Sequence, residues 1–318
     1  MRVQPHPLPL KSTVILSARL RVAAIDFLNP APLMWDFEHS PLAAGLAQRY
    51  ELHYTRPSDC AANLLAGRAD LGLIPIAALT PELAIVPGCT IASLDRVRSI
   101  QLIVKHKFAQ LHPATDLDPE LESDAGFLSD AEVLRGVHTI AADTASRSSL
   151  AYAQVLFRKF LGTQPDFLPA PADPVAMLQT ADAALLIGDP ALLALESRAA
   201  IEQRIGPCLW IDLAHQWTRR TGLPWVAAVW AVRPEAVDRG DELVADLTRS
   251  RDHGLNHIDD LVREWTPRIA MPPATIRHYL TRNIHYRLDP ACIEALALFR
   301  RYAAEIDALP PLPVPRFL

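Results

Sequence analysis

The sequence predicts an α/β protein built from two lobes of similar construction. The main observation is a strand–helix–strand–helix–strand order between residues 21 and 76, which returns between residues 138 and 187. Such units form mostly parallel sheets that are covered by helices. The length of 318 residues and the hydrophobic share of 50% are sufficient for two cores of this kind.

The first copy alternates short apolar runs with turn or helix signals. Its strands are expected at residues 21–25, 50–55 and 70–76. Residues 58–66 should form a helix with Ser58 or Asp59 as its N-cap, and Gly67 should end it. A helical turn is expected at residues 33–37.

The second copy repeats this order. Its strands are expected at residues 138–142, 166–169 and 182–187. A helix should run over residues 149–160, and a second one should follow Asp173 as N-cap. A third should open with Asp189 as N-cap and Pro190 as the first helical residue. Helix-period spacing predicts four more helices, at residues 242–250, 257–265, 273–281 and 290–306.

Two further apolar strands, residues 100–104 and 225–232, are expected to be the crossovers between the lobes. This division gives lobe I as residues 20–101 and 226–318, and lobe II as residues 102–225. Residues 1–19 form an N-terminal extension, and the Pro-rich residues 309–315 should be extended.

Composition restricts the class of partner. The net charge is −5, with 31 basic and 36 acidic side chains, so a nucleic acid partner is not expected. No segment is long and apolar enough to span a bilayer, and the N-terminus lacks the apolar region of a secretory signal. We therefore expect a cytoplasmic protein with no membrane partner; the oligomeric state cannot be predicted from the sequence.

The four cysteines also indicate a reducing compartment. They are far apart and show no CxxC spacing, so buried or half-buried free thiols are expected: Cys60, Cys89, Cys208 and Cys292.

In open α/β sheets, ligands bind outside the carboxyl ends of the strands. This rule selects residues 26–30, 144–149 and 188–190, while Pro75 and Ile76 end the remaining strand of the first lobe. We therefore expect a ligand cleft between the two lobes, lined by these segments.

The loop 144–149 carries the clearest chemical signal. Hydroxyls of Thr144, Ser146 and Ser148 and the guanidinium of Arg147 precede or open a helix, where backbone N–H groups and the helix dipole favour an anion. The alternative is that a serine only caps the helix and Arg147 is solvated. The loop lacks the GxxxxGK[ST] spacing of a nucleotide site, so a carboxylate is favoured over a triphosphate.

Other candidates are weaker. Asn29 and Ser99 lie at a strand end and a strand start, where turn-capping and purely structural roles remain open. His253 and His257 have a zinc-like i, i+4 spacing but lack the HExxH glutamate, which favours a solvated face. Asp189 could pair with Asp143 or could simply cap a helix. Neither a metal nor a nucleotide cofactor is predicted.

Several segments together resemble the chorismate dehydratase family of the futalosine route to menaquinone. The resemblance covers about residues 20–305 and depends on motifs in the right order: Phe27-Leu28-Asn29-Pro30, residues 69–76, Pro87 to Ser93, Val97-Arg98-Ser99, Asp143 to Ser149, Leu186 to Pro190 and Tyr279 to Ile284. The family's usual Tyr-Leu-Asn-Thr loop has Phe27 and Pro30 here, but Asn29 and Ser99 are kept. The resemblance implies the fold of type II periplasmic binding proteins.

The resemblance also implies the reaction. A hydro-lyase, which is a carbon–oxygen lyase, removes water from chorismate to give 3-((1-carboxyvinyl)oxy)benzoate without a cofactor. It implies Asn29 and Ser99 as catalytic residues. The substrate-binding residues would be Thr144, Ser146, Arg147, Ser148, Gly188, Asp189, Pro75 and Ile76. The alternatives are 1,4-dihydroxy-6-naphthoate synthase of the same pathway, or a non-catalytic protein that binds a small anionic solute.

Overall fold

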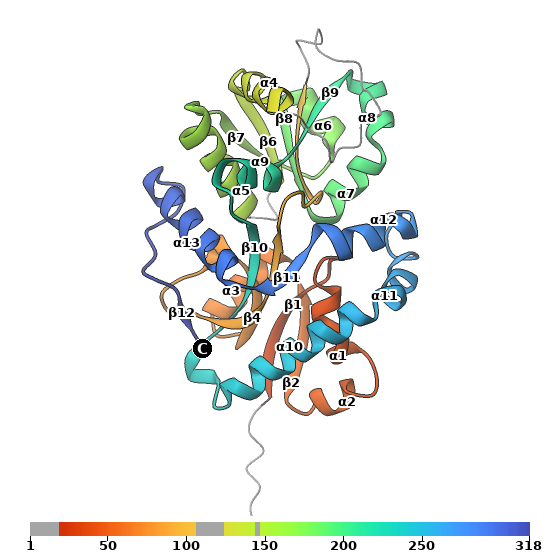
Figure 1. The fold of residues 1–318 in the computed structure, drawn as a ribbon, viewed down its shortest axis with the longest axis vertical. Helices are drawn as coiled ribbons and strands as arrows, with labels where there is room; N and C mark the ends of the chain where they lie inside the picture. The colour runs from red at the N-terminus through yellow and green to blue at the C-terminus, as the bar shows by residue number, and fades with distance from the viewer. Residues whose placement is uncertain (1–18, 106–123, 144–146) are drawn as a thin grey trace, which may run out of the picture.

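The computed structural model describes residues 19–105, 124–143 and 147–318 and contains two sheets, one above the other along the long axis (Figure 1). Residues 1–18 of the expected N-terminal extension, and Thr144 and Ser146 of the expected anion loop, lie outside the described residues.

The lower sheet has the order β11-β4-β10-β3-β1-β2, and β12 pairs with β4. Strand β1 is parallel to β2 and β3, whereas β10 is antiparallel to β3 and β4. The bounds are β1 Leu20–Ile25, β2 Tyr50–Thr55, β3 Leu71–Pro75, β4 Ala84–Ser93, β10 Trp225–Val232, β11 His285–Leu288 and β12 Arg316–Phe317.

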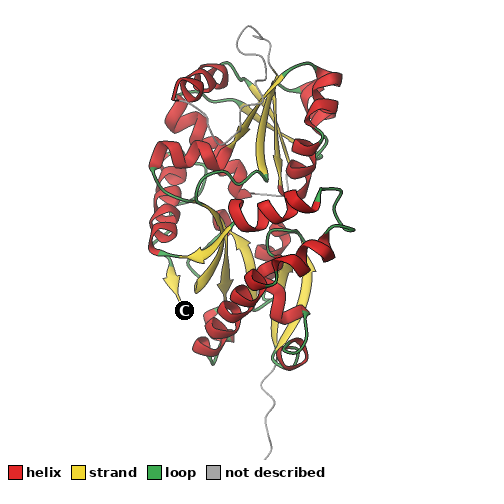
Figure 2. Cartoon of the chain, turned by 45° about the vertical axis from the view of Figure 1, so that its right-hand side comes forward, coloured by secondary structure: helices red, strands yellow, loops and turns green. Residues whose placement is uncertain are grey.

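The upper sheet has the order β7-β6-β8-β5-β9. Its strands are β5 Ile100–Lys105, β6 Thr139–Asp143, β7 Asp166–Ala170, β8 Ala183–Ile187 and β9 Cys208–Asp212. Leu102 and Leu185 belong to the main core, whereas Ile103 and Leu186 belong to a second core. Neighbouring side chains on a strand point to opposite faces, so both faces of this sheet are buried. Figure 2 shows the helices that cover them.

The helices divide between the two sheets. Around the lower sheet lie η1 Ala31–Met34, α1 Trp35–Glu38, α2 Ala43–Leu46, α3 Pro57–Leu65, η2 Ile76–Ala78, η4 Pro234–Ala236, α10 Gly240–Asn256, α11 Ile258–Trp265, α12 Pro273–His278 and η5 Tyr279–Asn283. Around the upper sheet lie α4 Asp124–Arg135, α5 Arg147–Val155, η3 Leu156–Leu161, α6 Pro174–Thr180, α7 Gly188–Glu196, α8 Arg198–Ile205 and α9 Leu213–Thr221. Helix α13 Pro290–Glu305 packs on both α5 and β10.

The predicted fold class is confirmed, and each predicted strand is present with its ends shifted by at most one residue. Strands β4, β9, β11 and β12 were not predicted. The expected crossovers need a correction, because β5 pairs only within the upper sheet and β10 only within the lower one. The chain passes between the sheets just before each of these strands, at residues 94–99 and 222–224. We propose lobe I at residues 20–101 and 226–318 and lobe II at residues 102–225. The sheets divide the chain within two residues of these boundaries, since Ile100 and Gln101 belong to the upper sheet and Trp225 to the lower one.

Helix starts were predicted less well. Helix α3 begins at Pro57 with Arg56 as N-cap, so the predicted cap at Ser58 or Asp59 is wrong. The fixed φ of proline suits the first helical position. Asp173 does cap α6, since its carboxylate accepts the backbone N–H groups of Val175 and Ala176.

The four cysteines are buried free thiols, as predicted. Among the described residues, no helix combines the length and the apolar character needed to cross a membrane.

Candidate functional site

A pocket with about 570 Å³ of empty space, part of which is open solvent, lies between the two sheets. It is lined by Ile25, Phe27, Asn29, Pro30, Pro57, Leu73, Pro75, Ile91, Val97, Ser99, Ile100, Ser149, Ile187, Gly188, Trp225, Ala227 and Ala228. The carboxyl ends of β1, β3 and β8 all reach it, at Ile25, Pro75 and Ile187, as the strand-end rule predicts.

Asn29 enters this cavity from the loop after β1. Pro30 follows it and is the N-cap of η1, so the amide is held at the end of a strand and the start of a buried turn. The Asn29 Oδ1 atom is buried and has no hydrogen-bond partner among the described residues. Buried polar atoms normally have a partner, so this oxygen is suited to accept a hydrogen bond from a ligand.

Ser99 enters from the opposite sheet, directly before β5. Arg98 has a φ of +61°, and the Ser99 N–H donates to the Val97 carbonyl at 2.8 Å, which makes a tight three-residue turn. The buried Asp212 carboxylate stabilises this turn by accepting the Arg98 N–H at 2.6 Å. The Ser99 hydroxyl is therefore presented to the cavity by a strained backbone of the kind that gathers at functional sites.

Tyr279 is a neighbour of Ser99 that the sequence analysis did not assign. Its side chain is buried, which raises the pKa of the phenol, and it shares a hydrogen bond with the Ser99 hydroxyl. The phenol thus remains protonated near neutral pH and can donate to Ser99. The only sequence signal was its place in the segment 279–284, which carried part of the family resemblance.

The described part of the anion loop lies at the start of α5. Arg147 is the first residue of this helix and its side chain is exposed. Ser148 is buried and accepts the Ala77 N–H at 3.1 Å, which ties α5 to the lower lobe. Ser149 lines the cavity instead, and local sequence gave no reason to choose it over its neighbour.

Of the remaining predicted site residues, some line the cavity and others do not. Pro75 and Gly188 line the cavity, whereas Ile76 is buried in η2 outside the lining. Asp189 is not the N-cap of α7, which is Ile187; its carboxylate instead accepts the backbone N–H of Leu28. Burial raises the pKa of Asp189 to about 6 despite that hydrogen bond.

The lining is mostly apolar. Among the described lining residues there is no Asp, Glu, His, Lys or Cys, so none of them can act as a strong base near neutral pH. Side-chain polar groups come from Asn29, Ser99, Ser149 and the indole N–H of Trp225, whose Nε1 atom is buried without a partner among the described residues. In such surroundings each hydrogen bond to a charged ligand is stronger than in water.

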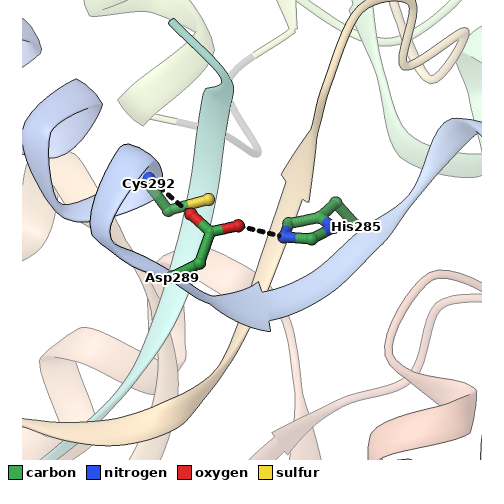
Figure 3. Close-up of side chains that lie close together, drawn as sticks. All are labelled: His285, Asp289 and Cys292. Carbon is green, nitrogen blue, oxygen red and sulfur yellow. Dashed lines mark hydrogen bonds and ion pairs between the residues drawn. The ribbon is translucent and has the colours of Figure 1, made fainter.

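The histidine clusters lie elsewhere. His253 pairs with Asp36 and His257 pairs with Asp260. The two histidines therefore contact different carboxylates, which does not favour a shared zinc ion. His285, Asp289 and Cys292 lie within reach of one metal ion (Figure 3). However, Asp289 already accepts from His285 Nε2 at 2.9 Å and from the Cys292 backbone N–H at 2.8 Å as the cap of α13. Burial also raises the pKa of the Cys292 thiol to about 12, which disfavours the thiolate that metals need.

The fold defines the class of protein first. The aliphatic sulphonate binding protein SsuA of Escherichia coli superposes with a TM-score of 0.61 at 14% identity, over 94% of this chain and 93% of that one. A solved protein from Archaeoglobus fulgidus gives the same TM-score at 14% identity, over 91% of this chain and 97% of that one. The chain therefore has the two-lobed fold of periplasmic binding proteins.

Sequence comparison defines the family. The profile of the menaquinone biosynthesis family matches residues 20–305, so the chain belongs to this family. A relative from Thermus thermophilus, named chorismate dehydratase, is 28% identical over 244 residues, which cover 73% of this chain and 79% of the relative. The family resemblance that the motifs indicated is confirmed.

Proposed function

We propose that this protein is a chorismate dehydratase, which eliminates water from chorismate to give 3-((1-carboxyvinyl)oxy)benzoate without a cofactor. One observation carries the proposal: the described lining of the cavity combines Asn29 and Ser99 with apolar side chains and contains no basic residue. The family and the relative from Thermus thermophilus support it. We also propose that the protein acts in the cytoplasm, on the futalosine route.

The reaction explains why a site without a base is suitable. A ring C–H bond breaks, its electrons complete the aromatic ring, and the ring hydroxyl leaves and becomes water by taking up a proton. The carboxylate of the enolpyruvyl group lies on the same molecule and takes the ring proton. The protein then has mainly to hold the substrate in the conformation that allows this transfer.

The residues take roles that fit their positions. Ser99, with the phenol of Tyr279 behind it, donates to the enolpyruvyl carboxylate. Asn29 faces it from the other lobe and holds the leaving hydroxyl, which can donate to the unpartnered Oδ1. The start of α5, with Arg147 and Ser148, binds the ring carboxylate through the helix dipole and hydrogen bonds. Thr144 and Ser146, which lie outside the described residues, keep the substrate-binding role that the resemblance implies.

Incubation of the purified protein with chorismate, without added cofactor, tests the proposal. We expect an aromatic ultraviolet spectrum to appear. Asn29→Ala should reduce turnover by at least about tenfold, a loss typical of one oriented hydrogen bond in a transition state. Asn256→Ala, at the exposed end of α10, is the matched control and should leave turnover unchanged.

Other outcomes would redirect the assignment. Chorismate that binds but is not converted would favour a solute-binding protein. No binding at all would favour 1,4-dihydroxy-6-naphthoate synthase. If Asn29→Ala and the wild type turn over equally fast, Asn29 has no place in the mechanism.

A further inference from the structure

The first turn of α7 contacts both candidate catalytic segments. The Gly188 N–H donates to the Ser99 carbonyl at 2.7 Å. The Asp189 carboxylate accepts the N–H of Leu28, the residue before Asn29. Gly188 follows β8 of the upper sheet, whereas Leu28 follows β1 of the lower sheet. Two adjacent residues thus connect the segments that enter the cavity from opposite lobes.

The packing at this point is close. Gly188 has a φ of +61°, which favours glycine, and a Cβ atom there would lie 3.0 Å from the ring of Phe27. The Phe27 ring therefore lies directly on the Gly188 backbone. The loop 27–29 is held against α7 both by this contact and by the Asp189 carboxylate.

The charge of Asp189 argues against the substrate-binding role that the resemblance implied. Asp189 is not among the residues that line the cavity, and an ionised carboxylate beside it would repel a substrate with two carboxylates. Asp26, on the facing loop, and the phenol of Tyr279, on η5, are the titratable groups that interact with it. The Leu28 N–H and the N-terminus of α7 are the groups that stabilise its charge.

We propose that Asp189 is a positioning residue, which holds the Leu28 amide across the cavity and so orients the Asn29 side chain toward the substrate. Gly188, in the same turn, fixes the carbonyl of Ser99, so one short segment sets the distance between the two catalytic side chains. We call the contact between the Asp189 carboxylate and the Leu28 N–H the clamp. The effect of the clamp on catalysis rests on the proposed roles of Asn29 and Ser99, whereas the clamp itself does not.

Hydrogen exchange of the Leu28 amide, measured by NMR, tests the clamp directly. The amide should be protected in the wild type and should exchange at least about tenfold faster in Asp189→Ala, because its acceptor is gone. Asp189→Asn keeps an acceptor oxygen and should restore most of the protection. Unchanged protection in Asp189→Ala would overturn the proposal.

Kinetics test the consequence. Asp189→Ala should lower kcat for chorismate by about tenfold with a KM that stays within about threefold or falls, whereas loss of a substrate ligand would raise KM. Asp189→Asn should recover much of kcat. Asp173→Ala, which removes the cap of α6 in the same lobe, is the matched control and should change neither kcat nor Leu28 exchange.

The two proposals fail in distinguishable ways. A wild-type protein that leaves chorismate unchanged would end the proposed function, while the Leu28 exchange would still decide the clamp. An active wild type whose Asp189→Ala variant raises KM and keeps Leu28 protected would retain the function and show Asp189 to be a substrate ligand.

Discussion

Asn29 carries a stability cost that a catalytic role can explain. Its Oδ1 atom is buried without a partner among the described residues, and such an atom destabilises the folded state by about 1–3 kcal/mol. A protein selected only for stability would not keep this arrangement, because an apolar side chain at the same position would avoid the cost.

We therefore predict that Asn29→Ala does not destabilise the ligand-free protein and raises its free energy of unfolding by up to about 1 kcal/mol. Urea denaturation of both proteins without ligand measures this difference. A loss of more than about 1 kcal/mol would mean that the amide has a structural partner and would weaken the catalytic interpretation.

Asp70, unlike Asn29, is a buried polar residue whose contacts all stabilise the folded state. Its carboxylate accepts from Arg21 Nε at 2.9 Å, from Arg21 Nη2 at 2.7 Å and from the Arg21 backbone N–H at 3.0 Å. Hydrogen bonding to Arg21 is the main reason why the pKa of Asp70 lies below its ordinary value. This contribution to stability is full above the unfolded-state pKa of about 3.9 and is lost as the pH falls through the folded-state pKa.

Asp70→Asn should thus lower the free energy of unfolding by about 1–2 kcal/mol at pH 7, and the difference should vanish at acid pH, where Asp70 is protonated in both states. Denaturation curves at several pH values measure it. Asp260→Asn is the control, because this carboxylate is on the surface and its loss should matter little. A difference that stays constant with pH would contradict the linkage.

At the scale of elements, Gly254 decides how closely α10 approaches the lower lobe. A Cβ atom on Gly254 would lie 2.1 Å from the Pro32 carbonyl oxygen, so the helix and the η1 turn touch backbone to backbone. Local sequence alone says only that a glycine inside a helix weakens it. Its real role depends on a residue more than two hundred positions away, which no local pattern reveals.

Gly254→Ala should destabilise the protein by about 3 kcal/mol or more, because neither backbone can move without disturbing buried side chains. Gly45→Ala is the matched control: it lies on helix α2 with nothing within 4 Å of the added Cβ, and it should stabilise slightly, by about 0.5–1 kcal/mol. Thermal unfolding of the two variants compares them. Equal melting temperatures would show that α10 can shift freely.

The elements that sequence could and could not predict differ in a physical way. Strand β8 is a continuous apolar run, and β1 is one from Val22 to Ile25, so the positions of both strands followed from that pattern. Strand β4 contains Pro87 and Gly88, which normally argue against a strand. They are tolerated because Gly88 has a φ of +94° and the pairing with β10 shifts register nearby, as at a β-bulge.

The residues of the candidate site could likewise be predicted from the sequence only in part. Asn29, Ser99 and Gly188 could be selected because strand ends and family motifs mark them, and the cavity brings them together. Asp189 looked like a helix cap because Asp before Pro is a typical capping pair. Its partner is Leu28 on the other lobe, and Tyr279 likewise reaches Ser99 from a distant helix. Contacts of this kind depend on the tertiary fold and have no local signature.

At the scale of the whole molecule, the two lobes share one continuous core. The main cluster of buried side chains includes Leu73 and Trp230 of the lower sheet together with Leu102 and Leu185 of the upper sheet. Arg300 on α13 also donates to the Ala77 carbonyl, close to the cavity. A ligand in the cavity would contact both lobes at once. Its binding free energy would therefore stabilise the folded protein in addition to the contacts that already join the lobes.

We accordingly predict that the aromatic product of the proposed reaction, 3-((1-carboxyvinyl)oxy)benzoate, raises the melting temperature. At a hundredfold excess over its dissociation constant the gain is about 2.7 kcal/mol, which corresponds to about 4–8 °C for a chain of this size. Benzoate, with one carboxylate, should give a smaller shift at the same concentration. Added salt should reduce the shift, because charge attraction at the start of α5 is screened. Equal shifts for the two compounds would mean that the cavity does not recognise a second carboxylate, and the assignment of Ser99 to the enolpyruvyl carboxylate would fail with it.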